Sequence, residues 1–326
     1  AAQIFWDLPL PGCNHFFIHP KKSGQLSTSV VVCLEPGVSM VNELLFPPLA
    51  VKVGLTCLVA QTVLSFLFAR VLPAGPWTQL PGLTAHQVVC LPLMIYLAYQ
   101  GFHVWFTQQD ELYQQGMEGR IFGVSPAGAD IAAWIWGMML FWDIPASLVV
   151  PALQDTLMLV HHVGMMFVAG VVTGVFSNGH PIGSYYASFY FGMIEFSSIF
   201  LTVVDLFHPK NKAWHTWLEQ SQSTAAAMAR NLNEVLRPLF ALSYLAVRCG
   251  LFPYVMFTTC LADFWKASML STMEERHGIS HYTLLLVCFI CLGFTMLQLY
   301  WGTLVVRQIA KALGIGNAKK DSPKSD

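Results

Sequence analysis

Charged side chains are scarce in this sequence. Asp, Glu, Lys and Arg make up 11% of its 326 residues, whereas a soluble domain has about 25%. This scarcity excludes an ordinary soluble globular protein. The formal net charge of −1 gives no basis for a nucleic-acid partner, and none is expected. The chain also lacks a P-loop, a glycine fingerprint after a strand, a GxSxG elbow and an HExxH helix, so nothing supports a nucleotide-binding protein or a hydrolase.

Cysteines are present, but their spacing does not predict a metal or redox site. The chain has eight, most of them within apolar stretches, where a free cysteine acts as a small hydrophobic side chain. The one close pair, Cys288 and Cys291, lies inside VCFICLGF and has no second pair outside the apolar stretches to complete a ligand set. We therefore expect no metal and no cofactor.

Apolar residues are abundant instead. Hydrophobic residues make up 55% of the chain and ten residues are Trp, which predicts an integral membrane protein with aromatic residues at both interfaces. Apolar runs long enough to cross a bilayer, which takes about 20 residues, lie near 49–72, 84–107, 130–150, 155–175, 184–206, 237–265 and 281–306. We predict an all-α polytopic bundle of about seven spans, within a range of six to eight, with a kink or a broken helix at Pro253.

The sequence divides into three parts: a surface arm (1–48), a transmembrane domain (49–313) and a polar C-terminal tail (314–326). The arm has a candidate strand at 27–34 and no signal-peptide or transit-peptide pattern. With seven spans, most of the basic residues fall on one face, namely Arg70, Lys210, Lys212, Arg230, Arg237, Arg307, Lys311 and the lysines of the tail. The positive-inside rule places that face and the C-terminus on the cytoplasmic-equivalent side.

Ionisable groups recur inside the predicted spans at similar depths. Asp143 and the His161–His162 pair lie about equally far before and after a turn near Pro151, so they share a depth in an antiparallel helical hairpin. Glu195 and Arg248, on the fifth and sixth spans, reach a comparable level, and all of these groups lie about 14–18 Å from one face at 1.5 Å per residue. Groups of this kind are costly inside a bilayer, so they should face inward, pair with one another and mark a site.

Helical phase refines the placement of the histidines. Asp155 precedes His162 by seven residues, so the two share a helix face and Asp155 could lie one or two turns from the imidazole. The side chains of His161 and His162 point about 100° apart. We therefore expect at most one of them to face a central cavity squarely, while the other packs against a neighbouring helix.

A histidine held by a carboxylate can act as a general base. In a lipid-filled cavity this chemistry suits acyl transfer from a thioester to a lipid-like acceptor, with acyl-CoA as a substrate. Two other roles stay open: lipid binding or regulation, and a buried hydrogen-bonded cluster that only fixes helix packing. The candidate residues are His161 or His162 as the base, Asp155 or Asp143 to orient it, Glu195 or Ser198 at the acceptor, Arg248 to offset carboxylate charge or hold a thioester or head group, and Tyr244 as a lipid contact.

Two HxxxH pairs, His15–His19 and His277–His281, resemble, together with His161–His162, the histidine boxes of membrane di-iron oxygenases. The predicted topology argues against a shared site. Both HxxxH pairs fall on the non-cytoplasmic side, about 20 Å along the fourth span from His162. We expect them to be hydrogen-bonded residues at the membrane interface.

The residues in and around the proposed site resemble the TLC (TRAM–LAG1–CLN8) domain family over roughly 51–313. Five short motifs occur in the family's order: GMMLFWD ending at Asp143, QDTLMLVHH with Asp155 and His161–His162, MIEFSSIFL with Glu195, Ser197, Ser198 and Phe200, SYLAVR ending at Arg248, and QLYWGTLVV with Gln298, Tyr300 and Trp301. The resemblance implies a bundle of six to eight helices around a central lipid-facing cavity.

Within that family, ceramide synthases are acyl-CoA-dependent N-acyltransferases, and the histidine pair belongs to their active site. This chain has no His-Asp pair after its two histidines, and it is more similar to the TLC-domain-containing proteins linked to lipid homeostasis. Membrane lipids are the expected partners, in the endoplasmic reticulum or another endomembrane. The alternative is a non-catalytic accessory subunit of a larger membrane complex, bound to other subunits, with a structural lipid in its cavity and a mitochondrial or plastid membrane as a further location.

Overall fold

Helices make up the secondary structure of the part of the chain that the computed structural model describes, residues 47–314. No strand occurs in this range, so the all-α prediction is confirmed. The arm as far as residue 46, its candidate strand, His15–His19 and the tail from residue 315 lie outside the described residues.

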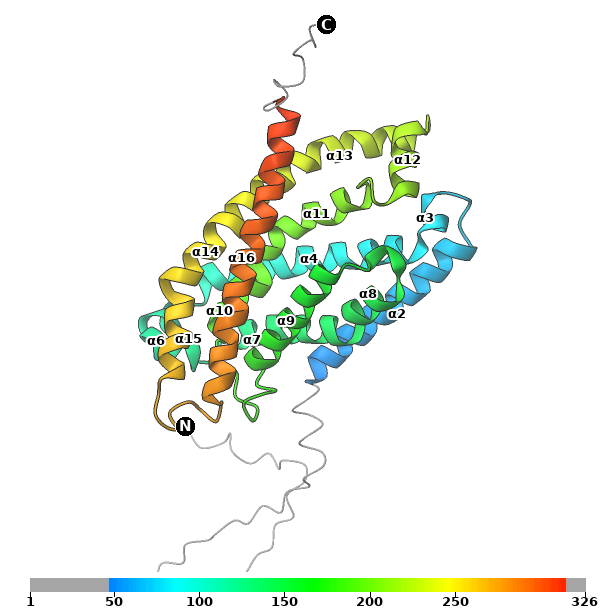
Figure 1. Cartoon of the computed structure of the whole chain (residues 1–326). Helices are drawn as coiled ribbons and strands as arrows, with labels where there is room; N and C mark the ends of the chain where they lie inside the picture. The colour runs from blue at the N-terminus through cyan, green and yellow to red at the C-terminus, as the bar shows by residue number, and fades with distance from the viewer. Residues whose placement is uncertain (1–46, 315–326) are drawn as a thin grey trace, which may run out of the picture. The chain divides into compact units, whose positions relative to one another are not determined.

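Within residues 47–314, six helices are long and apolar enough to cross a bilayer. They are α2 (Pro48–Arg70), α4 (Pro81–Thr107), the composite helices Pro126–Val149, Ser184–Leu206 and Thr224–Ser268, and α16 (His281–Ala312). The fourth predicted span is α9 (Thr156–Val172), whose 17 residues rise about 26 Å, less than the bilayer core of about 30 Å. The bundle therefore has six full-length helices and a shorter seventh segment, within the predicted range (Figure 1).

The three composite helices contain π-helical turns. The first consists of α7 (Pro126–Met138), the π turn η1 (Met139–Asp143) and α8 (Ile144–Val149). The second consists of α10 (Ser184–Ala187), the π turn η3 (Ser188–Gly192), the 3-10 turn η4 (Met193–Glu195) and α11 (Phe196–Leu206). The third consists of α13 (Thr224–Ser243), the π turn η5 (Tyr244–Leu251), α14 (Phe252–Val255), the π turn η6 (Met256–Cys260) and α15 (Leu261–Ser268).

Prolines account for two of these π turns. Pro145 and Pro253 each lie two residues after a π turn ends, at η1 and η5. A proline has no N–H to donate and its ring clashes with the carbonyl four residues earlier, and a widened turn accommodates both effects. The irregularity predicted at Pro253 is therefore present, and it takes the form of π turns inside one long helix.

Glycines bring the backbones of neighbouring helices into contact. A Cβ at Gly137 would lie 2.0 Å from the carbonyl oxygen of Ala50, so α7 and α2 meet where only glycine fits. A Cβ at Gly101 would lie 2.1 Å from the backbone nitrogen of Met193, so α4 meets η4 in the same way. Small residues at crossings are typical of membrane helix packing, and here they fix the segments that precede Asp143 and Glu195.

Shorter helices lie in the connections: α3 (Pro76–Gln79), α5 (Asp110–Gln114), α6 (Gly116–Ile121), the 3-10 turn η2 (Pro151–Leu153) and α12 (Lys212–Gln220). The connection between the predicted spans 184–206 and 237–265 holds α12, and α13 begins within it at Thr224. Trp77, Trp214 and Trp217 cluster beside it with ring centroids 5.6–6.5 Å apart, as expected of an aromatic group at a membrane interface.

Candidate functional site

Asp143 is the last residue of the π turn η1 and is 4% exposed. Each carboxylate oxygen has an imidazole partner. Oδ1 lies 2.8 Å from Nε2 of His86 on α4, and Oδ2 contacts Nδ1 of His162 on α9. Trp142 stacks on the His86 ring with centroids 4.9 Å apart. Three helices therefore converge on one buried carboxylate, and the predicted pairing of Asp143 with the histidine pair is present.

The contact with Asp143 determines which nitrogen of His162 can act as a general base. A carboxylate accepts hydrogen bonds, so Nδ1 of His162 carries the proton that faces Asp143 Oδ2. In the neutral ring the lone pair then lies on Nε2, the nitrogen that a general base uses. The side chain of His162 is 18% exposed, so this imidazole is not sealed within the bundle.

The His86–Asp143–His162 cluster lies closer to the helix ends than predicted. His86 comes five residues after the start of α4, Asp143 six residues before the end of α8, and His162 six residues after the start of α9. At 1.5 Å per residue this corresponds to about 8–9 Å from the ends of the helices. Glu195 lies eleven residues before the end of α11, which is about 16 Å. The predicted groups therefore meet at two levels rather than one.

A second cluster forms around Glu195 and Arg248, which are 6% and 7% exposed. Nη2 of Arg248 lies 3.1 Å from Oε2 of Glu195, and Nε donates to Oγ of Ser197 at 2.8 Å. Ser198 Oγ accepts from Arg248 Nη2 at 2.8 Å and donates to Glu195 Oε2 at 2.6 Å. The buried charges were predicted to pair with one another, and the structure pairs Glu195 with Arg248, with the two serines completing the set.

Cys90 links the two clusters. It lies one helical turn after His86 on α4, and Thr202 Oγ1 is 3.9 Å from its sulfur. The same Thr202 hydroxyl lies 2.7 Å from the main-chain oxygen of Ser198, which belongs to the second cluster. The two clusters are therefore connected through α4 and α11, although they lie at different levels. Sequence reasoning missed both His86 and Cys90, whose spacing of four residues on one apolar helix was the available signal.

The adjacent histidines diverge, as helical phase predicted. His161 is 8% exposed, and its ring meets the edges of Phe294 and Trp301 with centroids 5.0 and 5.5 Å apart. Its ring centroid lies 5.7 Å from that of His162. Among the described residues, Nδ1 of His161 has no hydrogen-bond partner. His162 therefore belongs to the Asp143 cluster, whereas His161 faces a cavity.

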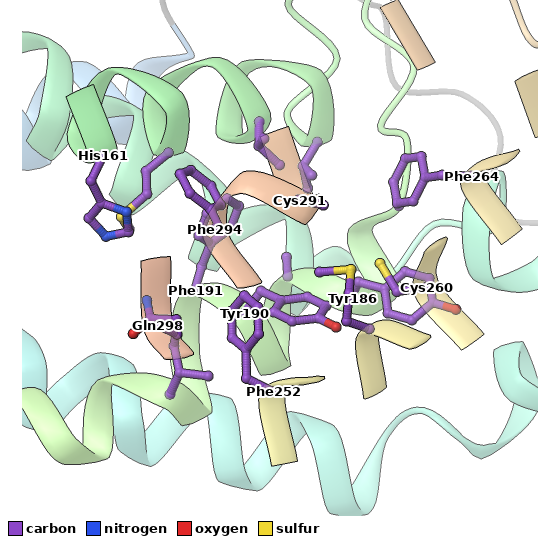
Figure 2. A pocket seen from close by; sticks show the side chains of 17 residues that line it. His161, Tyr186, Tyr190, Phe191, Phe252, Cys260, Phe264, Cys291, Phe294 and Gln298 are labelled. Carbon is purple, nitrogen blue, oxygen red and sulfur yellow. The ribbon is translucent and has the colours of Figure 1, made fainter. Parts of the chain in front are cut away.

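This cavity lies between α9, the segment α10–η4, the segment α14–α15, and α16. Figure 2 shows His161 and Gln298 at one end and Phe264 with Cys260 towards the other. Phe191, Tyr190 and other apolar or aromatic side chains line the space between them. The cavity therefore has a polar end and an apolar remainder, and this lining matches the chemistry of a hydrocarbon chain that ends in a polar group.

Tyr244 lies between the Arg248 cluster and this cavity. Its hydroxyl donates to the side-chain oxygen of Gln298 at 2.9 Å and lies 3.1 Å from the main-chain oxygen of the same residue. The guanidinium carbon of Arg248 is 6.0 Å from the centre of the tyrosine ring. Tyr244 therefore supports a cavity residue rather than lining the cavity itself. Gln298 was noted only as part of a motif, because no charge or spacing marked it as a site residue.

Asp155 occupies a different position from the one that the spacing predicted. It is exposed and precedes the first residue of α9, where its carboxylate accepts from the backbone N–H of Met158 at 3.0 Å. This is an ordinary helix N-cap. The carboxylate that contacts His162 is Asp143.

The HxxxH residues within the described range form hydrogen bonds at the other end of the bundle. His277 lies 2.8 Å from Nε2 of His180 through its Nδ1 and 3.4 Å from Glu118 through its Nε2. His281 Nδ1 contacts the backbone oxygen of Ser268. His277 and His281 thus have separate hydrogen-bond partners.

Fold and site together define a polytopic helical membrane protein with ionisable clusters beside an apolar cavity. The family model of the TLC domain (TRAM, LAG1 and CLN8) matches residues 77–307. This match covers more than half of the chain, and the protein belongs to the TLC domain family. No curated protein and no solved structure matches the chain. The family supports a lipid-related function in a membrane.

Proposed function

We propose that this protein transfers an acyl group between a thioester and a lipid-like acceptor inside the membrane. The observation that carries the proposal is the orientation of two adjacent histidines. His162 is held through Nδ1 by the buried carboxylate of Asp143, while His161 faces an apolar cavity. A base and a chain-binding space therefore lie side by side, with the two ring centroids 5.7 Å apart.

In the proposed reaction the acyl chain occupies the cavity with its carbonyl group at the His161 end. Nε2 of His162 takes the proton from a hydroxyl or amine of the acceptor. The acceptor oxygen or nitrogen then bonds to the carbonyl carbon, the carbon–sulfur bond breaks, and the departing thiolate takes the proton back from His162. Asp143 holds the imidazole in the required tautomer and stabilises its protonated form, the role of the carboxylate in other histidine-based acyl transfer.

The Glu195–Arg248 cluster has a supporting role in this proposal. The hydrogen-bonding groups of Glu195, Ser197 and Ser198 are engaged with Arg248. A group that is already paired inside a bilayer gains little by contacting an acceptor, because the contact would break a buried ion pair. We therefore assign these residues to fixing η5 against α11, instead of the predicted acceptor contact.

The test is acyl-CoA consumption by the full chain purified into lipid nanodiscs, together with lipid analysis of the products. His162→Ala should abolish turnover, Asp143→Asn should lower it about 100-fold or more, and His161→Ala should reduce it by weakening the binding of the chain. His215→Ala is the matched control, because His215 lies on α12 and pairs with Glu219. Turnover that survives both His162→Ala and Asp143→Asn overturns acyl transfer.

A protein that retains a lipid without turning over would support the lipid-binding role. Recovery of the chain only within a larger assembly in mild detergent, again without turnover, would support the accessory-subunit alternative. Both measurements use the same purified material as the activity assay.

A further inference from the structure

Gln298 is a polar residue in the middle of an apolar helix. It lies on α16 and is 1% exposed. A buried amide inside a membrane bundle is costly unless its donors and acceptors are paired. Its carbonyl oxygen is paired with the Tyr244 hydroxyl, while the amide group lines the cavity.

Tyr244 determines the orientation of this amide. Because the tyrosine O–H donates to Oε1 of Gln298 at 2.9 Å, the oxygen is turned towards η5. The nitrogen then points the other way, and Figure 2 shows it on the side that faces His161. The polar end of the cavity thus presents an amide N–H₂ and an imidazole to the same space.

The charge at this end of the cavity is equally informative. Among the residues that line the cavity there is no Lys, Arg, Asp or Glu. The nearby guanidinium of Arg248 is already paired with Glu195 and two serines. A carboxylate or phosphate would therefore lose its water without gaining a counter-ion, which is strongly unfavourable. A neutral carbonyl would need only a hydrogen-bond donor.

We propose that Gln298 binds the carbonyl oxygen of a neutral acyl ester, thioester or amide, and that Tyr244 is the residue that positions it. This inference rests on the proposed function, because it takes the acyl chain to lie in the cavity. It adds a specificity: the site accepts an esterified or amidated acyl chain and rejects the free acid of the same length.

The test uses the full chain in nanodiscs and two photoreactive probes of equal chain length, an acyl methyl ester and the corresponding free fatty acid. Crosslinking yield at saturating light gives the relative affinity. Wild type should prefer the ester by about tenfold, the effect of one well-placed hydrogen bond plus an unpaired charge avoided. Gln298→Leu should lower ester binding about fivefold and leave the weaker binding of the free acid unchanged, because only the ester uses the amide.

Tyr244→Phe removes one oxygen and keeps the ring, so it tests positioning without changing the packing. It should lower the preference for the ester about threefold, and adding it to Gln298→Leu should cause no further loss, because both act on one interaction. Thr295→Val is the matched control: Thr295 is a buried hydroxyl one turn away on α16 that bonds to the backbone of Cys291. Its probe preference should equal that of wild type.

Equal ester binding by wild type and both variants, or preference for the free acid in wild type, overturns the inference. Should Gln298→Leu fail to fold, Tyr244→Phe decides the question. Failure of the proposed function is a different result. If His162→Ala leaves turnover unchanged while ester binding depends on Gln298, acyl transfer is wrong and the carbonyl site stands. If turnover depends on His162 while neither turnover nor binding depends on Gln298, only the carbonyl site is wrong.

Discussion

Asp143 and Asp263 are two buried carboxylates, 4% and 3% exposed, with different partners. Asp143 meets two imidazoles. Asp263 accepts two hydrogen bonds from Arg120, at 2.6 and 3.0 Å, and one from the Tyr186 hydroxyl at 2.5 Å. An imidazole can gain or lose a proton near neutral pH, whereas a guanidinium cannot. The first arrangement can move protons, and the second can only hold parts of the structure together.

The Asp263 cluster connects three segments, since Arg120 lies on α6, Tyr186 on α10 and Asp263 on α15. Hydrogen bonding to Asp263 raises the pKa of Arg120 further above its already high ordinary value, so Arg120 stays charged at every pH of interest. Tyr186 also lines the cavity. The difference between the two clusters leads us to expect that substitutions at Asp143 change activity and substitutions at Asp263 change stability.

The largest effect should follow from Asp143→Asn. The amide keeps the size of the side chain but no longer stabilises a protonated His162, so turnover should fall by about 100-fold or more. The unfolding temperature in detergent should change little, because two neutral imidazoles remain beside a neutral amide. If Asp143→Asn instead lowers the yield of folded protein and leaves the turnover rate unchanged, the Asp143 cluster has a structural role, like the Asp263 cluster.

Asp263→Asn should have the opposite profile. It leaves Arg120, whose side chain is 13% exposed, without its carboxylate, and breaking a buried pair costs about 3 kcal/mol. Chemical denaturation monitored by tryptophan fluorescence would measure this loss, with Asp130→Asn on α7 as a control away from both clusters. Turnover per folded molecule should stay near the wild-type value, and a fall of tenfold would remove the distinction between the two carboxylates.

Glu195→Gln extends the comparison, because Glu195, like Asp263, is paired with a guanidinium. Arg248 would keep its hydrogen bonds to Ser197 and Ser198, so the destabilisation should be smaller than for Asp263→Asn, at about 2 kcal/mol. The same denaturation assay applies. A larger loss than at Asp263 would mean that the serines do not compensate.

His86→Asn should reduce turnover about fivefold, the effect of losing one hydrogen bond to the carboxylate. His162 would keep its own contact with Asp143, and the measurement is the rate at saturating acyl-CoA. A loss as large as that of His162→Ala would show instead that His86 is a second base.

The smallest effect is expected at Asp155. Asp155→Ala removes the cap of α9 and should destabilise the protein by about 1 kcal/mol without changing turnover per folded molecule. Asp155→Ser, which can still cap the helix, should restore the stability. If Asp155→Ser loses turnover while it keeps its stability, Asp155 helps to orient the histidine base after all.

Much of this arrangement could be predicted from the sequence. Hydropathy gave the spans, and the equal distances from the Pro151 turn placed Asp143 beside His162. The cost of isolated charges in a bilayer predicted that the buried ionisable groups pair with one another, but not that Glu195 would pair with Arg248. These inferences worked because they depend on length and charge alone.

The remaining features depend on local backbone geometry. The phase argument for Asp155 assumed that it lies within the helix, but a cap residue has non-helical dihedral angles, so side-chain spacing does not extend to it. His86 is a single histidine near a helix end, where an interfacial residue is the ordinary expectation. The direction of the Asp143 side chain follows from the π turn η1, which no apolar periodicity reveals.

A π turn holds one residue more than a regular turn, so η1 can be regarded as a single-residue insertion tolerated by the helices on either side of it. Removing one residue from Met139–Trp142 would restore a regular helix and rotate Asp143 by about 100°, away from both His86 and His162. Deletion of a single residue would therefore separate all three members of the cluster, and insertion of a single residue into a regular helix would be enough to bring them together.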